Sequence, residues 1–281
     1  VFGSAITEFA LPLTAVLTLQ ATPVEMGLLR SVQFAPYLLV GLFAGVWVDR
    51  LRKQLILVGA DFGRAILLGS IPLAVVFHLL RIEHLYIVAF CVGVLTVFFD
   101  VSYYAFLPFL VEPEQLIEGN SKLQASSSVA QIIGPGFAGQ LVGLVTAPVA
   151  IGADTLSFFL SALFLIQIRT QQPVSVLPSR SFNFWNELIE GIKVVFENPL
   201  LRSFLGCSST RNFFDSVQLS VYILYSTHDL GMSPSQLGVI FTISSCGALL
   251  GSLVAERLAQ WFGLGPTIVW SAFVRGIGAL L

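Results

Sequence analysis

The chain has 281 residues, of which 56% are hydrophobic and 11% are charged, and its formal net charge is −2. Soluble domains carry roughly 25% charged residues, so this composition, with a mean hydropathy of +0.86, excludes an ordinary water-soluble fold and indicates a lipid bilayer as partner. The small net charge provides no basic surface for nucleic acid. The three cysteines and three histidines lie apart from one another. They lack the spacing of a disulfide framework or a zinc site, so we expect no metal and no cofactor.

Nine apolar segments follow one another along the chain, and a helix needs about 20 apolar residues to cross a bilayer core of ~30 Å. Their continuous apolar character, without strict alternation, predicts helices rather than barrel strands. The fold class is therefore all-α and polytopic. The expected spans are Phe9–Val24, Ser31–Val48, Leu55–Leu79, Leu85–Leu107, two spans within Leu123–Ile168 separated at Gly143–Pro148, Leu201–Tyr225, Gln236–Ala255, and a ninth from Pro266 onward.

The longest connection between spans divides the chain into three parts. We expect an N-terminal six-helix bundle over 1–168 with a truncated first helix, a cytoplasmic linker over 169–199, and a partial C-terminal bundle over 200–281. Apolar residues recur at helical spacing from Trp185 to Phe196, which predicts an amphipathic helix on the membrane surface. The chain begins at Val1 and stops inside an apolar stretch at Leu281, so we expect it to be a piece of a longer protein.

The lysines and arginines predict the orientation, because cytoplasmic loops carry an excess of both. If the loop after the second span is cytoplasmic, ten basic residues fall on or near that side and only Arg81 lies clearly outside. We therefore expect a multi-pass protein of the cell (inner or plasma) membrane with a cytoplasmic N-terminus.

Two segments repeat at corresponding places in the two halves. Thr22-Pro23-Val-Glu25-Met-Gly27 precedes the second span, and Ser233-Pro234-Ser-Gln236-Leu-Gly238 precedes the eighth. Internal repeats of this kind are typical of secondary transporters, although chance similarity between apolar helices is the competing interpretation.

The sequence Gly45-Val-Trp-Val-Asp49-Arg50-Leu-Arg52-Lys53 ends the second span. It resembles the loop motif between spans 2 and 3 of the major facilitator superfamily. Gly41 and Gly45 lie one turn apart and permit close backbone approach by a neighbouring helix. By this resemblance, Gly41, Gly45, Asp49, Arg50, Arg52 and Lys53 form a latch between the two halves during alternating access.

The fifth span contains Ile133-Gly134-Pro135-Gly136-Phe-Ala-Gly139, which resembles the glycine–proline motif of antiporters in the superfamily. A packing kink is the alternative role for Gly134, Pro135 and Gly139. The wider pattern, including Phe98–Val101, Leu107–Leu116 and Asn120–Ser126, is similar to the macrolide-efflux and enterobactin-exporter branch. The fourth span lacks the arginine that many drug–proton antiporters of the superfamily carry there.

Charged residues inside spans usually face a cavity or a partner, because burying them in lipid is costly. Glu8 lies near the expected midplane of span 1, Asp100 lies in the cytoplasmic half of span 4, and Arg211 and Asp215 share a face of span 7. The superfamily fold implies that spans 1, 4 and 7 line the central cavity. We expect Glu8 and Asp100 to bind protons or a cation, and Arg211 and Asp215 to gate or orient substrate, with a fixed ion-pair network as the alternative.

Two other sets of charges have local interpretations. Asp61 and Arg64, three residues apart, predict a structural pair at the end of span 3. Asp154 is expected near the outer surface, where it would start the sixth span.

The function expected from these features is proton-coupled efflux of small amphipathic molecules, such as a drug or siderophore, by alternating access. No nucleotide-binding loop stands in a context that would support ATP coupling, and no convergent nucleophile or metal-ligand set predicts an intramembrane enzyme. An importer of a small metabolite, or a nontransporting scaffold or receptor, remains an alternative.

Overall fold

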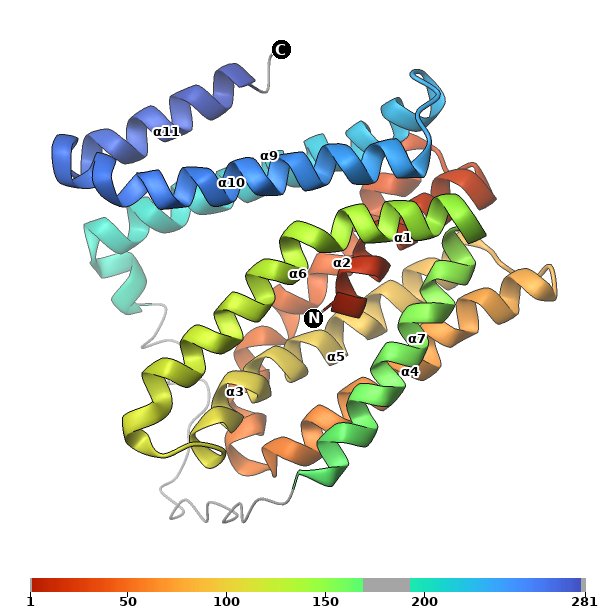
Figure 1. The fold of residues 1–281 in the computed structure, drawn as a ribbon, viewed down its shortest axis with the longest axis horizontal. Helices are drawn as coiled ribbons and strands as arrows, with labels where there is room; N and C mark the ends of the chain where they lie inside the picture. The colour runs from red at the N-terminus through yellow and green to blue at the C-terminus, as the bar shows by residue number, and fades with distance from the viewer. Residues whose placement is uncertain (1, 169–192, 279–281) are drawn as a thin grey trace.

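The structure is a computed structural model that describes residues 2–168 and 193–278, all of which belong to helices or to short connections between them. Figure 1 shows the order of the helices along the chain. The first part forms α1 (Phe2–Leu19), α2 (Pro23–Leu39), α3 (Gly41–Arg50), α4 (Lys53–Val76), α5 (Ile82–Phe106), the 3-10 turns η1 (Leu107–Phe109) and η2 (Pro113–Gln115), α6 (Leu116–Val145) and α7 (Ala147–Gln167). The second part forms α9 (Pro199–His228), α10 (Pro234–Phe262) and α11 (Leu264–Gly278).

Five helical segments among the described residues are long and apolar enough to cross a membrane. They are Lys53–Val76, Ile82–Phe109, Pro113–Val145, Ala147–Gln167 and Pro234–Gly251. These segments confirm the predicted spans 3 to 6 and the start of span 8, including the division of the long apolar stretch, which falls at Thr146. The chain is therefore an all-α, multi-pass membrane protein.

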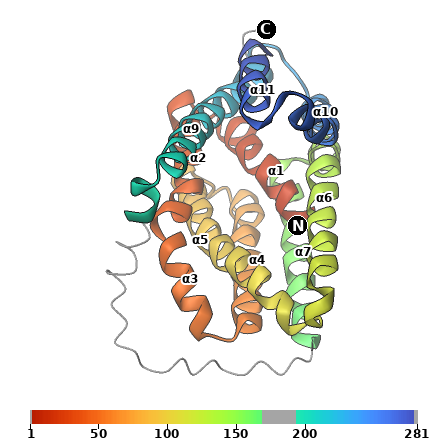
Figure 2. The ribbon, with the colours of Figure 1, turned by 90° about the vertical axis from the view of Figure 1, so that its left-hand side faces the viewer.

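The helices of the first part pack around a shared apolar core. Helix α4 lies against α5 and α7, α2 lies against α5, and α1 lies against α6 and α7. The core contains fully buried side chains from each of these contacts, including Leu13, Leu68, Leu85 and Ile151. Figure 2 shows α9, α10 and α11 together beyond one end of this group. They reach the first part through the contacts of α10 with α6 and of α9 with α2.

The boundary predicted for the first span is wrong at its C-terminal end. Helix α1 stops at Leu19, and Val24 already belongs to α2. Thr22 starts α2 through a capping box, in which its backbone N–H donates to Glu25 Oε2 at 2.7 Å and its hydroxyl oxygen accepts from Glu25 N–H at 3.3 Å. This local hydrogen bonding begins a new helix inside an apolar run that hydropathy alone joins together.

The second predicted span is also divided. Helix α2 ends at Leu39 and α3 begins at Gly41, with Val40 as the cap residue of both. The break follows Pro36, which has no backbone N–H to donate, and precedes Gly41, a residue of low helix propensity. Ser31–Val48 is therefore two helices that meet at Val40.

The predicted repeat forms the same local structure in both halves. Ser233 N–H donates to Gln236 Oε1 at 2.8 Å, and Ser233 Oγ accepts from Gln236 N–H at 3.3 Å. This matches the capping box of Thr22 and Glu25 at the start of α2. The two sequence copies thus start α2 and α10 in the same way.

The amphipathic helix predicted from Trp185 to Phe196 lies mostly outside the described residues. Only its last turn, over 193–197, is described, and this turn is helical.

The backbones of helices α6 and α10 come into close contact at Gly139 and Gly238. A Cβ placed on Gly139 would lie 2.6 Å from the Pro234 carbonyl oxygen and 2.7 Å from Gly238 Cα. Both contacts are with backbone, so neither neighbour can rotate away. Small residues are what allow helices to pack this closely in a membrane.

We predict that Gly139→Ala destabilises the native protein by about 1–3 kcal/mol, because the added methyl group forces α6 and α10 apart. Gly152→Ala in α7 is the matched control, since its Cβ would meet Pro72 Cγ at an ordinary 3.6 Å. Thermal unfolding of both variants in detergent measures the effect. Equal stability of the two variants would contradict the proposed crossing point.

Candidate functional site

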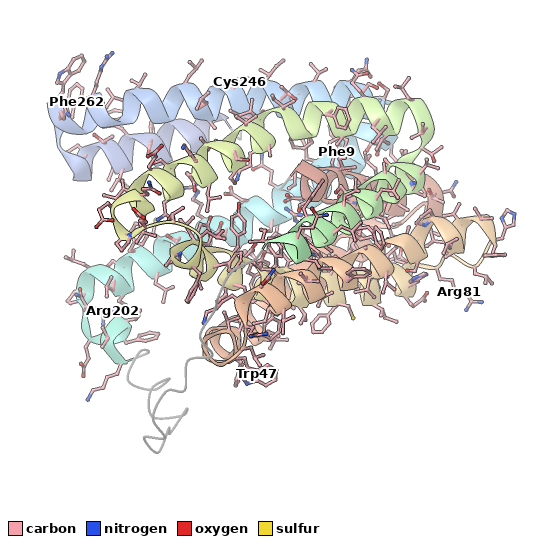
Figure 3. The ribbon with its side chains drawn as sticks, turned by 60° about the horizontal axis from the view of Figure 1, so that its bottom comes forward. Phe9, Trp47, Arg81, Arg202, Cys246 and Phe262 are labelled. Atoms are coloured by element: carbon pink, nitrogen blue, oxygen red, sulfur yellow. The ribbon has the colours of Figure 1, made fainter. Side chains whose placement is uncertain are left out.

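A cavity of about 200 Å³ lies where the first and second parts of the chain meet. Helices α1, α2, α6, α9 and α10 all contribute to it, and its lining includes Glu8, Phe9, Arg30, Pro135, Leu219 and Phe241. Phe9 and Phe241 pack edge to face across it, with ring centroids 5.8 Å apart. Figure 3 shows Phe9 among the helices and away from the outer surface. The cavity is therefore apolar, shared by both parts and equipped with two charged side chains.

Those two charges, Glu8 and Arg30, form an ion pair of 3.8 Å between α1 and α2. The Arg30 side chain is only 14% exposed, whereas that of Glu8 is 61% exposed. The Arg30 guanidinium lies over the Phe34 ring at 4.6 Å and donates to Gln33 Oε1 at 3.1 Å. Phe34 and Gln33 thus hold the Arg30 side chain in place. Glu8, with its larger exposed fraction, is the more accessible of the two charges.

Arg30 is a site residue that the sequence analysis missed. It stands directly before Ser31, where the second predicted span begins, so it was not counted among the charges inside spans. The structure places it within α2, eight positions into the helix that begins at Pro23. The sequence did offer a signal for Arg30. It is a charged residue in an apolar region, and Gln33 and Phe34 follow it at helical spacing as possible partners.

A second and larger cavity of about 1010 Å³ lies between α2 and α9. Arg30 lines both cavities, and Tyr37 and Asp215 line the larger one. Asp215 pairs with Arg211 at 3.6 Å, which confirms the predicted contact along one face of α9. Arg211 is 64% exposed, so water screens this pair far more than a buried one.

Asp100 accepts a hydrogen bond of 3.3 Å from the Tyr37 hydroxyl, which joins α5 to α2. Tyr37 also lines a third cavity of about 150 Å³ among α1, α2, α4, α5 and α7, and Glu8 lies on the same cavity. The two predicted titrating carboxylates therefore have different partners. Glu8 meets the cavities directly, whereas Asp100 reaches them through Tyr37.

Asp61 and Arg64 form the predicted pair, and it is almost completely buried. Asp61 is 1% exposed and Arg64 is 3% exposed. The guanidinium lies 4.2 Å from the Phe99 centroid and 4.5 Å from the Phe158 centroid. Ser161 on α7 donates to Asp61 Oδ2 at 2.6 Å. The pair thus joins α4 to α5 and α7.

The prediction for Asp154 is wrong. Asp154 is not at the start of its helix, because α7 begins at Ala147 and places the carboxyl two turns further in. It is fully buried and accepts hydrogen bonds from the hydroxyls of Thr7 on α1 and Ser157 on α7. The first two turns of α7 are apolar, so Asp154 lies inside the helix and not at its start. Helix α1 packs against α7 and buries the carboxyl group.

The latch residues Gly41 and Gly45 do not pack closely in the described part of the chain. A Cβ on either would have no neighbour within 4 Å. The residues of α3 that face inward are instead Ala44 and Val48, and both are fully buried. Trp47 of α3 stacks on Phe98 of α5. The close approach that the two glycines permit is therefore not made by any helix in the described part of the chain.

The other latch residues end α3 or start α4. Lys53 Nζ lies 5.7 Å from the Phe109 ring centroid, and the Arg52 carbonyl caps the start of α4. The side chains of Asp49 and Arg50 lie outside the described part of the structure.

The glycine–proline motif of α6 faces two different helices. A Cβ on Gly134 would overlap Ala5 of α1, Gly139 meets Gly238 of α10, and Pro135 lines the 200 Å³ cavity. The motif therefore lies at the junction of α1, α6 and α10.

Multi-pass apolar helices around internal cavities that carry charged side chains define a membrane transport protein. The chain belongs to the Major Facilitator Superfamily, whose family profile matches residues 1–214. Macrolide efflux protein A of Enterococcus faecalis is 26% identical over 245 residues, which cover 87% of this chain and 76% of that protein.

Two further relatives show the same similarity to efflux proteins. Macrolide efflux protein A of Streptococcus pyogenes is 26% identical over 87% of this chain and 60% of its own length. Multidrug efflux pump Tap of Mycolicibacterium fortuitum is 23% identical over 98% of this chain and 68% of its own length. The chain therefore spans between 60% and 76% of these relatives.

We predict that Arg64→Gln destabilises the native protein by about 3–5 kcal/mol, because Asp61 is left buried without its cation. The double variant Asp61→Asn/Arg64→Gln is expected to recover part of this loss, since neither charge remains. Lys122→Gln, which breaks the exposed pair with Glu118 at 2.8 Å, is the control and should leave stability unchanged. Unfolding in detergent measures all three, and a double variant less stable than Arg64→Gln would contradict the prediction.

Proposed function

We propose that the native protein exports small amphipathic molecules by alternating access and that protons drive this export. The observation that carries the proposal is the 200 Å³ cavity between the two parts of the chain, where Glu8 and Arg30 meet an apolar wall. Alternating access requires a site that both halves share, so that their relative motion exposes it to one side and then the other.

The chemistry of the cavity suits an amphipathic substrate. Phe9, Leu219 and Phe241 offer apolar and aromatic surface, and the exposed carboxylate of Glu8 offers an anchor for a polar or cationic group. Ligand pockets commonly combine a mostly apolar lining with a few placed polar groups. The adjoining 1010 Å³ cavity, which shares Arg30, provides room for a molecule larger than the inner cavity.

The relatives support export as the direction of transport. Two carry the name macrolide efflux protein and a third is named a multidrug efflux pump. A drug or siderophore is accordingly the proposed substrate class for this protein.

The proposed proton-binding groups are Glu8 and Asp100. Glu8 lines two internal cavities, and Asp100 is joined to them by Tyr37. Arg211 and Asp215 are proposed to gate or orient the substrate, because Asp215 lines the larger cavity. Buried or cavity-facing carboxylates are common members of proton relays in transporters.

The proposed domains are a six-span bundle over 1–168, a cytoplasmic linker over 169–199 and a partial bundle over 200–281. The latch at Asp49, Arg50, Arg52 and Lys53 would hold the halves on the cytoplasmic side. Figure 3 shows Arg81 and Arg202 at opposite ends of the molecule, which supports the proposed orientation of Arg81 outside and Arg202 inside.

We predict that Glu8→Gln lowers efflux of erythromycin or ethidium by about tenfold or more, because the carboxamide carries no charge and takes up no proton. Efflux from cells that produce the complete native protein, measured with and without a protonophore, tests this. Asp215→Asn is expected to lower efflux as well. Glu83→Gln, at the exposed start of α5, is the control.

If Glu8→Gln and Asp215→Asn both export the probe at the wild-type rate, the proposed roles of Glu8 and Asp215 in transport are wrong. Uptake in place of efflux by the wild-type protein would instead favour the importer.

The proposed orientation is tested by labelling single cysteines with a membrane-impermeant maleimide in intact cells. The free cysteines Cys91, Cys207 and Cys246 are first replaced by alanine. We expect Glu83→Cys, next to Arg81, to be labelled, and Glu114→Cys, between α5 and α6, to be labelled only after the cells are opened. The reverse pattern would mean that the N-terminus is outside.

A further inference from the structure

Asp154 is the one charged residue of α7, and it is fully buried where α7 packs against α1. Each carboxyl oxygen accepts one hydroxyl, with Thr7 at Oδ2 and Ser157 at Oδ1. Gly3, one turn before Thr7, also faces this carboxyl, since a Cβ there would overlap Asp154 Oδ1 and Ser157 Oγ. Helix α1 is therefore fitted closely around the carboxyl group.

Among the described residues, Asp154 makes no ion pair. The charged groups of the three helices packed against α7 have other positions or partners. On α4, Arg64 pairs with Asp61, and that pair meets α7 at Ser161 and at Phe158, which is one turn along the helix from Asp154. On α6, Glu118 and Lys122 pair with each other at the end remote from the turn into α7. Glu8 is the one charged residue of α1.

Thr7 and Glu8 both line the 150 Å³ cavity inside the first part of the chain. Ser4, Gln33, Tyr37 and Thr96 supply further polar groups around the same space. Apolar side chains make up most of the wall, and the space with these polar groups has room for a few waters, at about 30 Å³ for each. The hydroxyl of Thr7 thus stands between the Asp154 carboxyl and a space that reaches Glu8.

We propose that Asp154 is a further proton-binding residue of the transport cycle, connected to Glu8 through Thr7 and the 150 Å³ cavity. A proton that arrives from Glu8 converts the carboxylate of Asp154 to the neutral acid, and its departure restores the anion. No electron or other group moves. Hydroxyls serve both forms, because Thr7 and Ser157 can donate to the anion and either can accept from the acid.

The same proton changes the contact between α1 and α7. The anion accepts from Thr7, whereas the acid needs one of its two hydroxyl neighbours to accept instead. Protonation therefore alters the hydrogen bonding that holds α1, the helix that carries Glu8 into the cavity between the two parts. This proposal rests on the proposed function, since it gives Asp154 a role in coupling that transport to protons.

The test uses the complete native protein in proteoliposomes with radiolabelled erythromycin as the probe. Two quantities are measured, namely accumulation driven by an imposed pH gradient and exchange of erythromycin at equal pH. Asp154→Asn keeps the size and polarity of the side chain but binds no proton. We expect exchange within about twofold of the wild type, and gradient-driven accumulation lowered about tenfold or more.

Two further variants define the result. Asp154→Glu keeps a titratable carboxyl and is expected to restore part of the gradient-driven accumulation. Thr155→Val, next along α7, removes a hydroxyl that donates to the Ile151 carbonyl of its own helix, and it is the control for disturbance of α7. Wild-type accumulation by Asp154→Asn would overturn the proposal. A lowered melting temperature with equal loss of exchange and accumulation would also overturn it, since that result means a structural clamp.

An infrared measurement keeps this test separate from the proposed function. A pH jump on the purified protein should change a protonated-carboxyl C=O band in the wild type that is missing in Asp154→Asn. If the wild-type protein neither exchanges nor accumulates erythromycin, the proposed function fails for this probe, and the infrared band still decides the proton site. An unchanged band in Asp154→Asn would overturn the assignment.

Discussion

The structure depends on how charges are accommodated inside apolar helices. Asp61 and Arg64 illustrate the rule most fully, since both are buried and their partners come from three helices. Ser161 approaches from α7, and Phe99 approaches from α5. An isolated charge at this depth would be costly, so these helices must keep their relative positions for the pair to remain satisfied. The pair thereby constrains how α4, α5 and α7 pack in the first part of the chain.

The charges at the cavities follow the opposite arrangement. Glu8 and Arg30 are 3.8 Å apart and come from different helices, and one of the two is largely accessible. Arg211 and Asp215 lie on a single exposed face of α9. Water reaches at least one member of both pairs and weakens their attraction, most of all in the pair on α9. They can change partners when helices move, which is what a transport cycle requires of its charged groups.

Close approach of helices provides the second constraint. The crossing of α6 and α10 at Gly139 and Gly238 brings two backbones into contact and joins the two parts of the chain beside the shared cavity. Gly41 and Gly45 have the same spacing as many helix-packing glycines, yet no described neighbour covers them. Glycine spacing therefore shows where close contact is possible, and the arrangement of the other helices determines where it occurs.

The sequence by itself determined the features that depend on solvent and on local hydrogen bonding. Hydropathy determined the membrane class and the helices α4 to α7, because a bilayer requires long apolar segments whatever their packing. The repeated cap residues determined how α2 and α10 begin, because a capping box involves residues only three apart.

Tertiary structure alone decided which polar and charged side chains of different helices meet. Arg30 and Glu8 are 22 positions apart in the sequence, and Thr7 and Asp154 are separated by 147. No periodicity within one helix reports such a contact. Packing of α1 against α7 buries Asp154, which the sequence placed at a helix start, and packing of α1 against α2 and α6 places Glu8 at the cavities. The physical reason is that burial of a side chain depends on which neighbouring helix covers its face.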